Sequence, residues 1–438
     1  MRVAFHTLGC KVNQYETEAM REQFTAAGHE VVGEEEAADA YIINTCTVTG
    51  LADRKSRQYI RRMKKKSPGS IVAVTGCYVQ IKPDEVAAID GVDIIAGTNE
   101  KENILGYIES YKKSHEESDS DDNEKARDAE RHVLAYEALG EYMSSGIITS
   151  MESRTRAYIK IEDGCDRFCS YCVIPYARGP VRSRPADEIM AEAKSLVGRG
   201  FKELILTGIN TALYEDLPGL LQRLDDLEGD FRVRLSSLEP TVVNAGYVKG
   251  LLGFRRLCHH LHLSLQSGSD NVLRAMRRRY DMDEYMEIVS VLRQADPLYG
   301  LSTDIIAGFP GETDEDIAAS VACIEKTSFC KTHAFNYSQR PGTVAAAMTE
   351  QIAPPVRKER VSMLIEAGER AQTGFAQANV GTENTVLFEE RSADGNIMAG
   401  YTDNYVRAYA EHDEKLLGQL VKVRITGLYE DGVMCEPV

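Results

Sequence analysis

The sequence lacks any long apolar run and is short of positive charge. No run approaches the roughly 18 apolar residues that a helix needs to cross a bilayer, so we expect no membrane-spanning segment. Residues 1–6 are typical of a strand and not of a signal peptide, which predicts a cytoplasmic protein. Lys and Arg number 51 against 68 Asp and Glu, and the net charge of -17 argues against indiscriminate nucleic-acid binding. Only a local basic patch could contact phosphates.

Length and composition indicate a globular protein of several domains. A chain of 438 residues is too long for one ordinary core and predicts two or three domains. Hydrophobic residues make up 43% and charged residues 27%, which is typical of a soluble protein. Ten cysteines in an unsecreted chain indicate metal binding or catalysis before disulfides.

Three of these cysteines lie in one short stretch, Asp163-Gly-Cys-Asp-Arg-Phe-Cys-Ser-Tyr-Cys172. The CxxxCxxC spacing of Cys165, Cys169 and Cys172 predicts an iron–sulfur cluster, because a four-iron cluster takes four ligands and these are usually thiolates. Three ligands from one loop leave one iron without a protein ligand. This iron can bind another molecule, just as the open position of a catalytic zinc binds substrate. The alternatives are a structural zinc, whose fourth ligand is missing nearby, and three inert thiols.

This stretch resembles the signature of the radical S-adenosylmethionine (SAM) enzymes. The resemblance implies that the three cysteines hold a [4Fe-4S] cluster whose open iron chelates the amino and carboxylate groups of SAM. One electron from the cluster would cleave SAM into methionine and a 5′-deoxyadenosyl radical, chemistry that the cofactor carries. The resemblance also implies that Tyr171 lies against the adenine of SAM.

Residues 1–112 alternate strands and helices, which predicts a parallel sheet with helices on both faces. Cys10, Cys46 and Cys77 each lie just past the end of a predicted strand. Ligands of such sheets bind beyond the carboxyl ends of the strands, so we expect the three thiols to converge on a second cluster, again with an open iron. The alternative is three separate buried thiols. The predicted strands are 3–8, 41–45, 71–75 and 92–96, and the helices 15–27 and 51–66.

Two charged segments interrupt this pattern. Segment 54–66 holds eight basic residues and no acidic one, so it is either a solvated helix face or a phosphate-contacting surface. Residues 113–150 are expected to form a charged linker or excursion, because the acidic segment 116–124 and its surroundings have too few apolar residues to bury.

Residues 151–375 repeat the strand–helix alternation six times, which predicts a partial (β/α)6 barrel with its site at the carboxyl ends of the strands. Polar residues and glycines after these strands suggest a SAM pocket, although each could instead be turn or cap chemistry. The candidates are Gly208, Ser237, Glu239, Gln266 and Ser267. The predicted strands are 157–161, 203–207, 232–236, 260–265, 301–307 and 333–337.

Two groups of arginines in this region allow two interpretations. They either bind a phosphate or carboxylate or form surface ion pairs. The groups are Arg178, Arg182 and Arg184, and Arg274, Arg277, Arg278 and Arg279. The histidines His259, His260 and His262 are expected to alternate across a strand and are not assigned as metal ligands.

Residues 376–438 contain five short strand-like segments, which predict a small antiparallel β-barrel. Such barrels often bind nucleic acid, but acidic residues outnumber basic ones here. Cys435 is expected to be an ordinary thiol, as are Cys258, Cys323 and Cys330.

The full chain resembles the methylthiotransferase family of radical SAM enzymes, ending in a TRAM-like domain, and is most similar to the MtaB type. The resemblance rests on the six cysteines and on four motifs: Gly9-Cys-Lys-Val-Asn-Gln-Tyr-Glu-Thr17, Leu235-Ser-Ser-Leu-Glu-Pro240, Leu263-Ser-Leu-Gln-Ser-Gly-Ser-Asp270 and Thr303-Asp-Ile-Ile-Ala-Gly-Phe-Pro-Gly-Glu-Thr313. Asp166, the stretch after Gly208 and Asn336 depart from the family pattern, which affects fine substrate contacts more than the cysteine chemistry.

The resemblance implies two [4Fe-4S] clusters, SAM as cofactor, and methylthiolation of C2 of N6-threonylcarbamoyladenosine beside the anticodon of tRNA. The auxiliary cluster would carry the sulfur on its open iron; one SAM would methylate it and a second would yield the radical. An electron donor such as a flavodoxin or ferredoxin is also implied. The alternatives are methylthiolation of isopentenyladenosine tRNA or of a ribosomal-protein aspartate, and an iron–sulfur tRNA-binding sensor without turnover.

Overall fold

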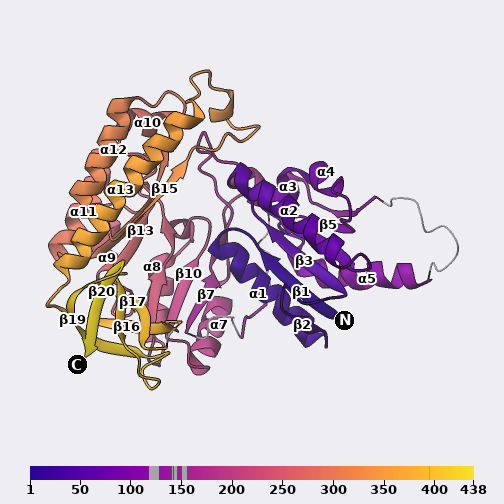
Figure 1. The fold of residues 1–438 in the computed structure, drawn as a ribbon, viewed down its shortest axis with the longest axis horizontal. Helices are drawn as coiled ribbons and strands as arrows, with labels where there is room; N and C mark the ends of the chain where they lie inside the picture. Colours follow the sequence, from indigo (N-terminus) through magenta and orange to yellow (C-terminus); the bar gives the residue numbers. More distant parts are fainter. Residues whose placement is uncertain (118–127, 141, 143–145, 150–154, 394) are drawn as a thin grey trace.

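A computed structural model describes residues 1–117, 128–140, 142, 146–149, 155–393 and 395–438 of the chain. Three parts follow one another: a parallel α/β sheet, a partial (β/α) barrel and a small closed β-barrel (Figure 1). The predicted fold class is confirmed in each part. Among the described residues, no helix combines the length and apolarity needed to span a bilayer. Residues 118–124 of the acidic segment lie outside the described residues.

The N-terminal sheet has the order β2-β1-β3-β4-β5-β6, and all its pairs are parallel. The four predicted strands are present, and two further strands of three residues each are added at the edges. The last of these, β6, lies within 113–150, the stretch expected to be a linker, and pairs with β5. The strands are β1 (Arg2–Thr7), β2 (Glu30–Val32), β3 (Ala40–Thr45), β4 (Ile71–Gly76), β5 (Ile94–Ala96) and β6 (Glu130–His132).

Helices cover both faces of this sheet because successive strand residues point to opposite sides. On one face Ile43 and Val74 pack against Ile60 and Met63 of α2. On the other face Phe5 packs with residues of α1 and α5. The helices are α1 (Lys11–Ala26), α2 (Gly50–Lys66), α3 (Cys77–Ile81), α4 (Pro83–Ala87) and α5 (Ile104–Glu117).

The middle part is built from two arcs of parallel strands, β11-β10-β7 and β12-β13-β14-β15. A bridge between Val233 and Leu257 connects the arcs. All six predicted strands are present, as β7 (Arg156–Lys160), β10 (Glu203–Thr207), β11 (Arg232–Leu235), β13 (His260–Leu263), β14 (Gly300–Ala307) and β15 (Lys331–Asn336). The short strands are β8 (Glu162–Asp163), β9 (Arg182–Ser183) and β12 (Ser237–Leu238).

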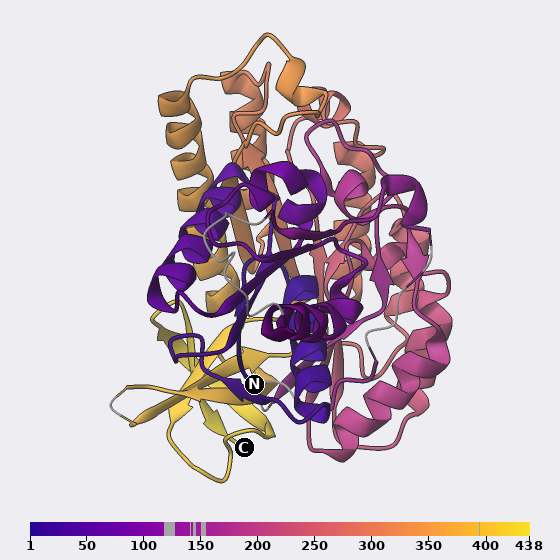
Figure 2. The same ribbon diagram turned by 90° about the vertical axis from the view of Figure 1, so that its right-hand side faces the viewer.

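Helices line the outer side of these arcs, and the N-terminal part lies across from them (Figures 1 and 2). Alternate strand residues such as Ile159, Leu206 and Leu263 belong to the core beneath the helices. The helices are α6 (Ile174–Arg178), α7 (Ala186–Gly198), α8 (Leu217–Asp226), α9 (Ala245–Leu251), α10 (Asp270–Ala275), α11 (Met282–Ala295), α12 (Asp314–Thr327) and α13 (Pro354–Ala378).

The C-terminal barrel closes in the order β16-β17-β18-β20-β19. One detail of the antiparallel prediction is wrong: β18 and β20 pair in parallel, and this pair closes the barrel. The barrel packs against the start of the central strands, where Arg232 and Arg234 donate to the carbonyl oxygens of Tyr401 and Asp403. Its strands are β16 (Glu383–Arg391), β17 (Ile397–Thr402), β18 (Arg407–Glu411), β19 (Leu420–Tyr429) and β20 (Gly432–Pro437).

Candidate functional site

The loop that carries Cys165, Cys169 and Cys172 follows β8, beyond the carboxyl end of β7. All three thiols line a cavity of about 340 Å³ at this end of the barrel. The loop turns sharply: the N–H of Cys172 donates to the carbonyl of Cys169 at 3.0 Å, and Phe168 adopts a left-handed φ of 45°. A bulky residue in that region is strained, as backbone near functional sites often is.

Gly164 permits the close packing of this loop. Its φ is +87°, and a Cβ at this position would lie 1.9 Å from the carbonyl oxygen of Pro180. The N–H of Cys165 can therefore donate to the carbonyl oxygen of Gly179 at 3.1 Å. Glycine is needed here because any side chain would push the cysteine loop away from the segment that follows α6.

The three sulfurs form a suitable donor set for a cluster. Burial, together with the neighbouring thiols of Cys169 and Cys165, raises the pKa of Cys172 to about 12. Burial likewise raises the pKa of Cys165 to about 12. Such closely placed thiolates need a cationic partner, and an iron cluster that displaces the protons provides one. N–H groups also point at the sulfurs: Ile174 N donates to Cys172 Sγ and Arg278 Nη1 to Cys169 Sγ, both at 3.4 Å.

The cavity brings together four of the six predicted SAM-pocket residues. Tyr171, Ser237, Glu239 and Gln266 line it, together with the three thiols. Gln266 has a left-handed φ of 71° and sits beside β14, where its N–H donates to the carbonyl oxygen of Asp304 at 2.8 Å.

Gly208 and Ser267 lie outside the lining of the cavity. A Cβ on Gly208 would lie 2.6 Å from Glu162 Oε2, so this glycine allows the next two residues, Ile209 and Asn210, to reach the cavity. The Ser267 hydroxyl is buried and accepts a hydrogen bond from the N–H of Ser269 at 3.2 Å, as a turn residue does.

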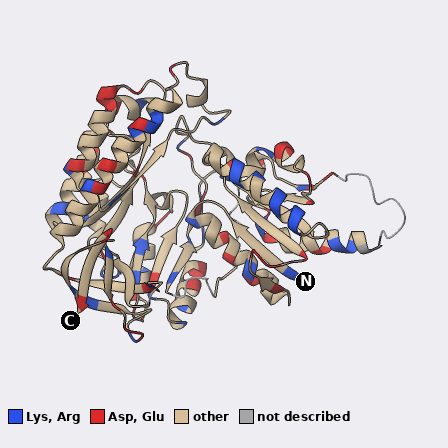
Figure 3. Cartoon of the chain, viewed as in Figure 1, with Lys and Arg blue, Asp and Glu red and all other residues tan. Residues whose placement is uncertain are grey.

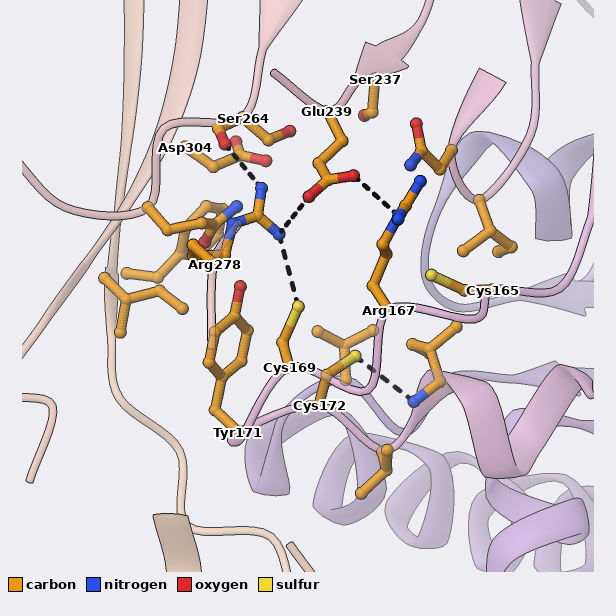
Figure 4. A pocket seen from close by; sticks show the side chains of 18 of the residues that line it. Cys165, Arg167, Cys169, Tyr171, Cys172, Ser237, Glu239, Ser264, Arg278 and Asp304 are labelled. Atoms are coloured by element: carbon orange, nitrogen blue, oxygen red, sulfur yellow. Dashed lines mark hydrogen bonds and ion pairs between the residues drawn. The ribbon is translucent and has the colours of Figure 1, made fainter. Parts of the chain in front are cut away.

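The sequence did not predict the ion pairs that Glu239 forms with two arginines in this cavity, which Figure 4 shows. Arg167 Nε lies 2.9 Å from Glu239 Oε2, and Arg278 Nη1 lies 3.8 Å from Glu239 Oε1. Arg278 therefore bridges Glu239 and Cys169, and its Nη2 donates to the carbonyl oxygen of Ser264 at 3.0 Å. Arg278 belongs to the second arginine group in the sequence, but no local pattern distinguishes it from its neighbours.

The other three predicted cysteines lie at the ends of adjacent strands. Cys10 follows β1, Cys46 follows β3 and Cys77 follows β4, and these strands are neighbours in the sheet. Gly9 is packed so closely that a Cβ there would lie 3.1 Å from Cys46 Sγ. Burial raises the pKa of Cys46 to about 12, with further contributions from the thiols of Cys77 and Cys10. The strand order thus brings three distant cysteines to one edge.

The two cysteine groups lie on segments that pack against each other. Helix α6, which begins two residues after Cys172, packs against α3, which begins at Cys77. Val48 and Thr49, just beyond Cys46, line the cavity that contains the first three thiols.

The first arginine group holds the two parts together in the protein interior, so the prediction of surface ion pairs is wrong for it. Arg178 and Arg184 are 0% and 1% exposed. Arg178 pairs with Glu16 and Asp163, and Arg184 pairs with Glu192. Protein carboxylates accept from the terminal nitrogens of Arg178 and Arg184, so these side chains are engaged in holding the fold together.

Comparison with protein-family models matches the three parts in order. The model described as Uncharacterized protein family UPF0004 matches residues 2–97, Radical SAM superfamily matches 159–324, and TRAM domain matches 377–431. The match to the middle model covers the last two residues of β7, the cysteine loop and the barrel strands β10 to β14, and it ends before β15.

Individual relatives match almost end to end. The chain is 41% identical to a threonylcarbamoyladenosine tRNA methylthiotransferase MtaB of Bacillus subtilis (strain 168), over 97% of this chain and 93% of the relative. It is 31% identical to a tRNA-2-methylthio-N(6)-dimethylallyladenosine synthase of Methylacidiphilum infernorum, over 97% and 92%.

A solved structure shares the fold. The radical S-adenosylmethionine methyltransferase TsrM from Kitasatospora setae matches with a TM-score of 0.59 and 15% identity, over 78% of this chain and 76% of that one. From the three family matches and the extensive 41% identity, the chain belongs to the methylthiotransferase family of radical SAM proteins, and within it to the MtaB type.

Proposed function

We propose that this protein replaces the C2 hydrogen of N6-threonylcarbamoyladenosine, at adenosine-37 beside the tRNA anticodon, with a methylthio group. The observation that carries the proposal is the nearness of the two three-cysteine groups: α3, which begins at Cys77, packs against α6 after the cysteine loop, and Val48 and Thr49 beyond Cys46 line the cavity of the first three thiols. Methylthio transfer needs both a means of activating an unreactive C–H bond and a source of sulfur.

Cys165, Cys169 and Cys172 would hold the cluster that binds SAM, and when bound the cluster supplies the electron for reductive cleavage of SAM. The surrounding chain binds and orients this cofactor. The Glu239 carboxylate, flanked by Arg167 and Arg278, presents an acceptor for an amino or hydroxyl group. Tyr171 is half-buried beside the thiols and offers an apolar ring surface to the adenine.

Cys10, Cys46 and Cys77 would hold a second cluster that carries the sulfur. Cys46 and Cys77 are buried and Cys10 is exposed, so the site opens on one side. A loop base is single-stranded and can be turned out of its stack into the cavity, which adjoins both cysteine groups. The electron would come from a carrier such as a flavodoxin or ferredoxin, and we place the reaction in the cytoplasm.

Anaerobic turnover tests the proposal. The protein with both clusters reconstituted is incubated with SAM, reductant and tRNA that carries threonylcarbamoyladenosine unmodified at C2, and the digested nucleosides are analysed by mass spectrometry. A methylthio mass gain on threonylcarbamoyladenosine is expected. A gain on isopentenyladenosine or on a ribosomal-protein aspartate instead would overturn the substrate assignment. Binding of tRNA with intact clusters and no product would favour a sensor.

A further inference from the structure

The basic segment 54–66 lies on α2 (Figure 3), and seven of its eight cations fall into two sets. The eighth, Lys55, is exposed and belongs to neither set. The first set is paired: Arg57 with Glu85, Arg62 with Glu35, and Lys64 with Asp93. Lys66 also contacts Glu35. These pairs tie the flanks of the helix to the rest of the N-terminal part.

The second set points away from the protein. Arg54, Arg61 and Lys65 are exposed, and no hydrogen bond or ion pair joins them to another described residue. Their spacing of seven and four residues places them on one stripe of the helix, about 16 Å long at 1.5 Å per residue. We call Arg54, Arg61 and Lys65 the α2 ridge. The opposite face, with Tyr59, Ile60 and Met63, is buried against the sheet.

The α2 ridge begins at the mouth of the cavity. Thr49 caps the helix by accepting a hydrogen bond from the N–H of Ala52, and it also lines the cavity. Two exposed apolar side chains connect the cavity with Arg54: Val48, which lines the cavity and is 53% exposed, and Leu51, which is 59% exposed. A ligand that fills the cavity and extends to the ridge therefore passes over the apolar surface of Val48 and Leu51.

We propose that the α2 ridge contacts the phosphate backbone of the RNA whose base enters the cavity. A row of unneutralised cations on a chain of net charge -17 is complementary to a linear polyanion. Val48 and Leu51 provide the apolar surface on which an unpaired base can rest. This inference rests on the proposed function and adds the surface that aligns the RNA with the two cysteine groups.

The test is the salt dependence of RNA binding by the full-length protein with both clusters. A labelled anticodon stem-loop RNA is titrated at several salt concentrations against wild type and the variant Arg54→Gln/Arg61→Gln/Lys65→Gln. Each lost phosphate contact should reduce the slope of log K against log salt by about 0.7–1, so the variant should lose roughly 2–3. The matched control is Arg57→Gln/Arg62→Gln/Lys66→Gln, which removes the same charge from the paired flanks and should leave the slope unchanged.

Equal changes in both variants would indicate a net-charge effect and overturn the proposal, as would an unchanged slope in the ridge variant. The ridge variant could also bind RNA normally while its clusters are reduced by dithionite but no longer by a flavodoxin. That result would assign the ridge to an acidic electron carrier and overturn the proposal. The single variant Arg61→Gln, with about one third of the effect, guards against misfolding of the triple variant. The wild-type protein could show the steeper salt dependence of RNA binding that the ridge variant loses, yet form no methylthio product. In that case the proposed function fails, but the inference that the ridge contacts RNA remains valid.

Discussion

Glu16 on α1 and Arg178 at the end of α6 form a fully buried ion pair, with Oε1 and Nη1 2.8 Å apart. The pair joins the N-terminal part to the helix that follows the cysteine loop. Lys101 and Lys160 also contact Glu16, and Asp163 accepts from Arg178 at 3.0 Å. Asp163 begins the stretch that contains the first three cysteines, so this network sets how the two cysteine groups face each other.

Removing Arg178 should destabilise the protein strongly. Arg178→Met leaves the carboxylates of Glu16 and Asp163 buried with less compensation, which costs about 3–5 kcal/mol. Arg370→Met is the control: the ion pair of Arg370 with Glu325 is exposed, and its loss should cost less than about 1 kcal/mol. The measurement is the thermal unfolding of both variants and of wild type. Equal, small effects of both variants would refute a structural role for the network.

The two cysteine groups should separate in function. Cys165→Ala should abolish formation of 5′-deoxyadenosine, because the SAM-binding cluster loses a ligand. Cys46→Ala should stop methylthio transfer while some SAM cleavage continues. Both cysteine variants should also lose a large part of the bound iron. The measurements are the iron content, the 5′-deoxyadenosine formed and the methylthio nucleoside formed. Cys323→Ala, which removes a buried thiol from α12, should retain iron and both activities. Continued SAM cleavage by Cys165→Ala would contradict the assignment.

Gly208 should not tolerate a side chain. In Gly208→Ala the new Cβ would meet Glu162 Oε2 at 2.6 Å, and relief of this clash would displace Ile209 and Asn210 from the cavity. We expect a loss of about 1–3 kcal/mol in stability and weaker SAM binding, measured by unfolding and by calorimetry. Gly250→Ala on α9 meets nothing within 4 Å and should stabilise the helix slightly. Unchanged SAM affinity in Gly208→Ala would contradict this role.

Glu162 should make stability depend on pH. Burial raises the pKa of Glu162 well above its usual value of 4.5, opposed by the hydrogen bond from the N–H of Asn210. Because the folded pKa exceeds the unfolded one, the contribution of this group is largest at low pH and is lost as pH rises through the folded pKa. Glu162→Gln keeps an acceptor for the N–H of Asn210 but cannot ionise. The unfolding temperature of this variant should therefore rise relative to that of wild type as pH increases.

Unfolding temperatures of Glu162→Gln and wild type across the pH range where the clusters remain intact measure this difference. The exposed Glu325 gives the control Glu325→Gln, which should differ from wild type by the same small amount at every pH. A pH-independent difference for Glu162→Gln would show that this carboxyl is ionised throughout.

Much of the architecture was predictable because it depends on local patterns. Alternating strands and helices predicted the parallel sheet and the six barrel strands, with 203–207 matched to the residue. Two edge strands, β2 and β6, were missed because segments of three residues carry little periodicity. The parallel closure by β18 and β20 depends on which strands meet in space, and single-strand patterns do not encode that.

For the site, the sequence by itself determined that Cys165, Cys169 and Cys172 lie together, because three cysteines in one loop must be close in space. It also predicted the edge at which Cys10, Cys46 and Cys77 lie, since carboxyl ends of parallel strands share one side. Only the tertiary structure decided the partners of charged side chains. Arg178, Arg278 and Arg61 look alike in sequence, yet one is buried against Glu16, one spans Glu239 and Cys169, and one is exposed and unpaired among the described residues. The reason is that an ion pair depends on which surfaces are brought together by folding, and these partners lie far apart along the chain.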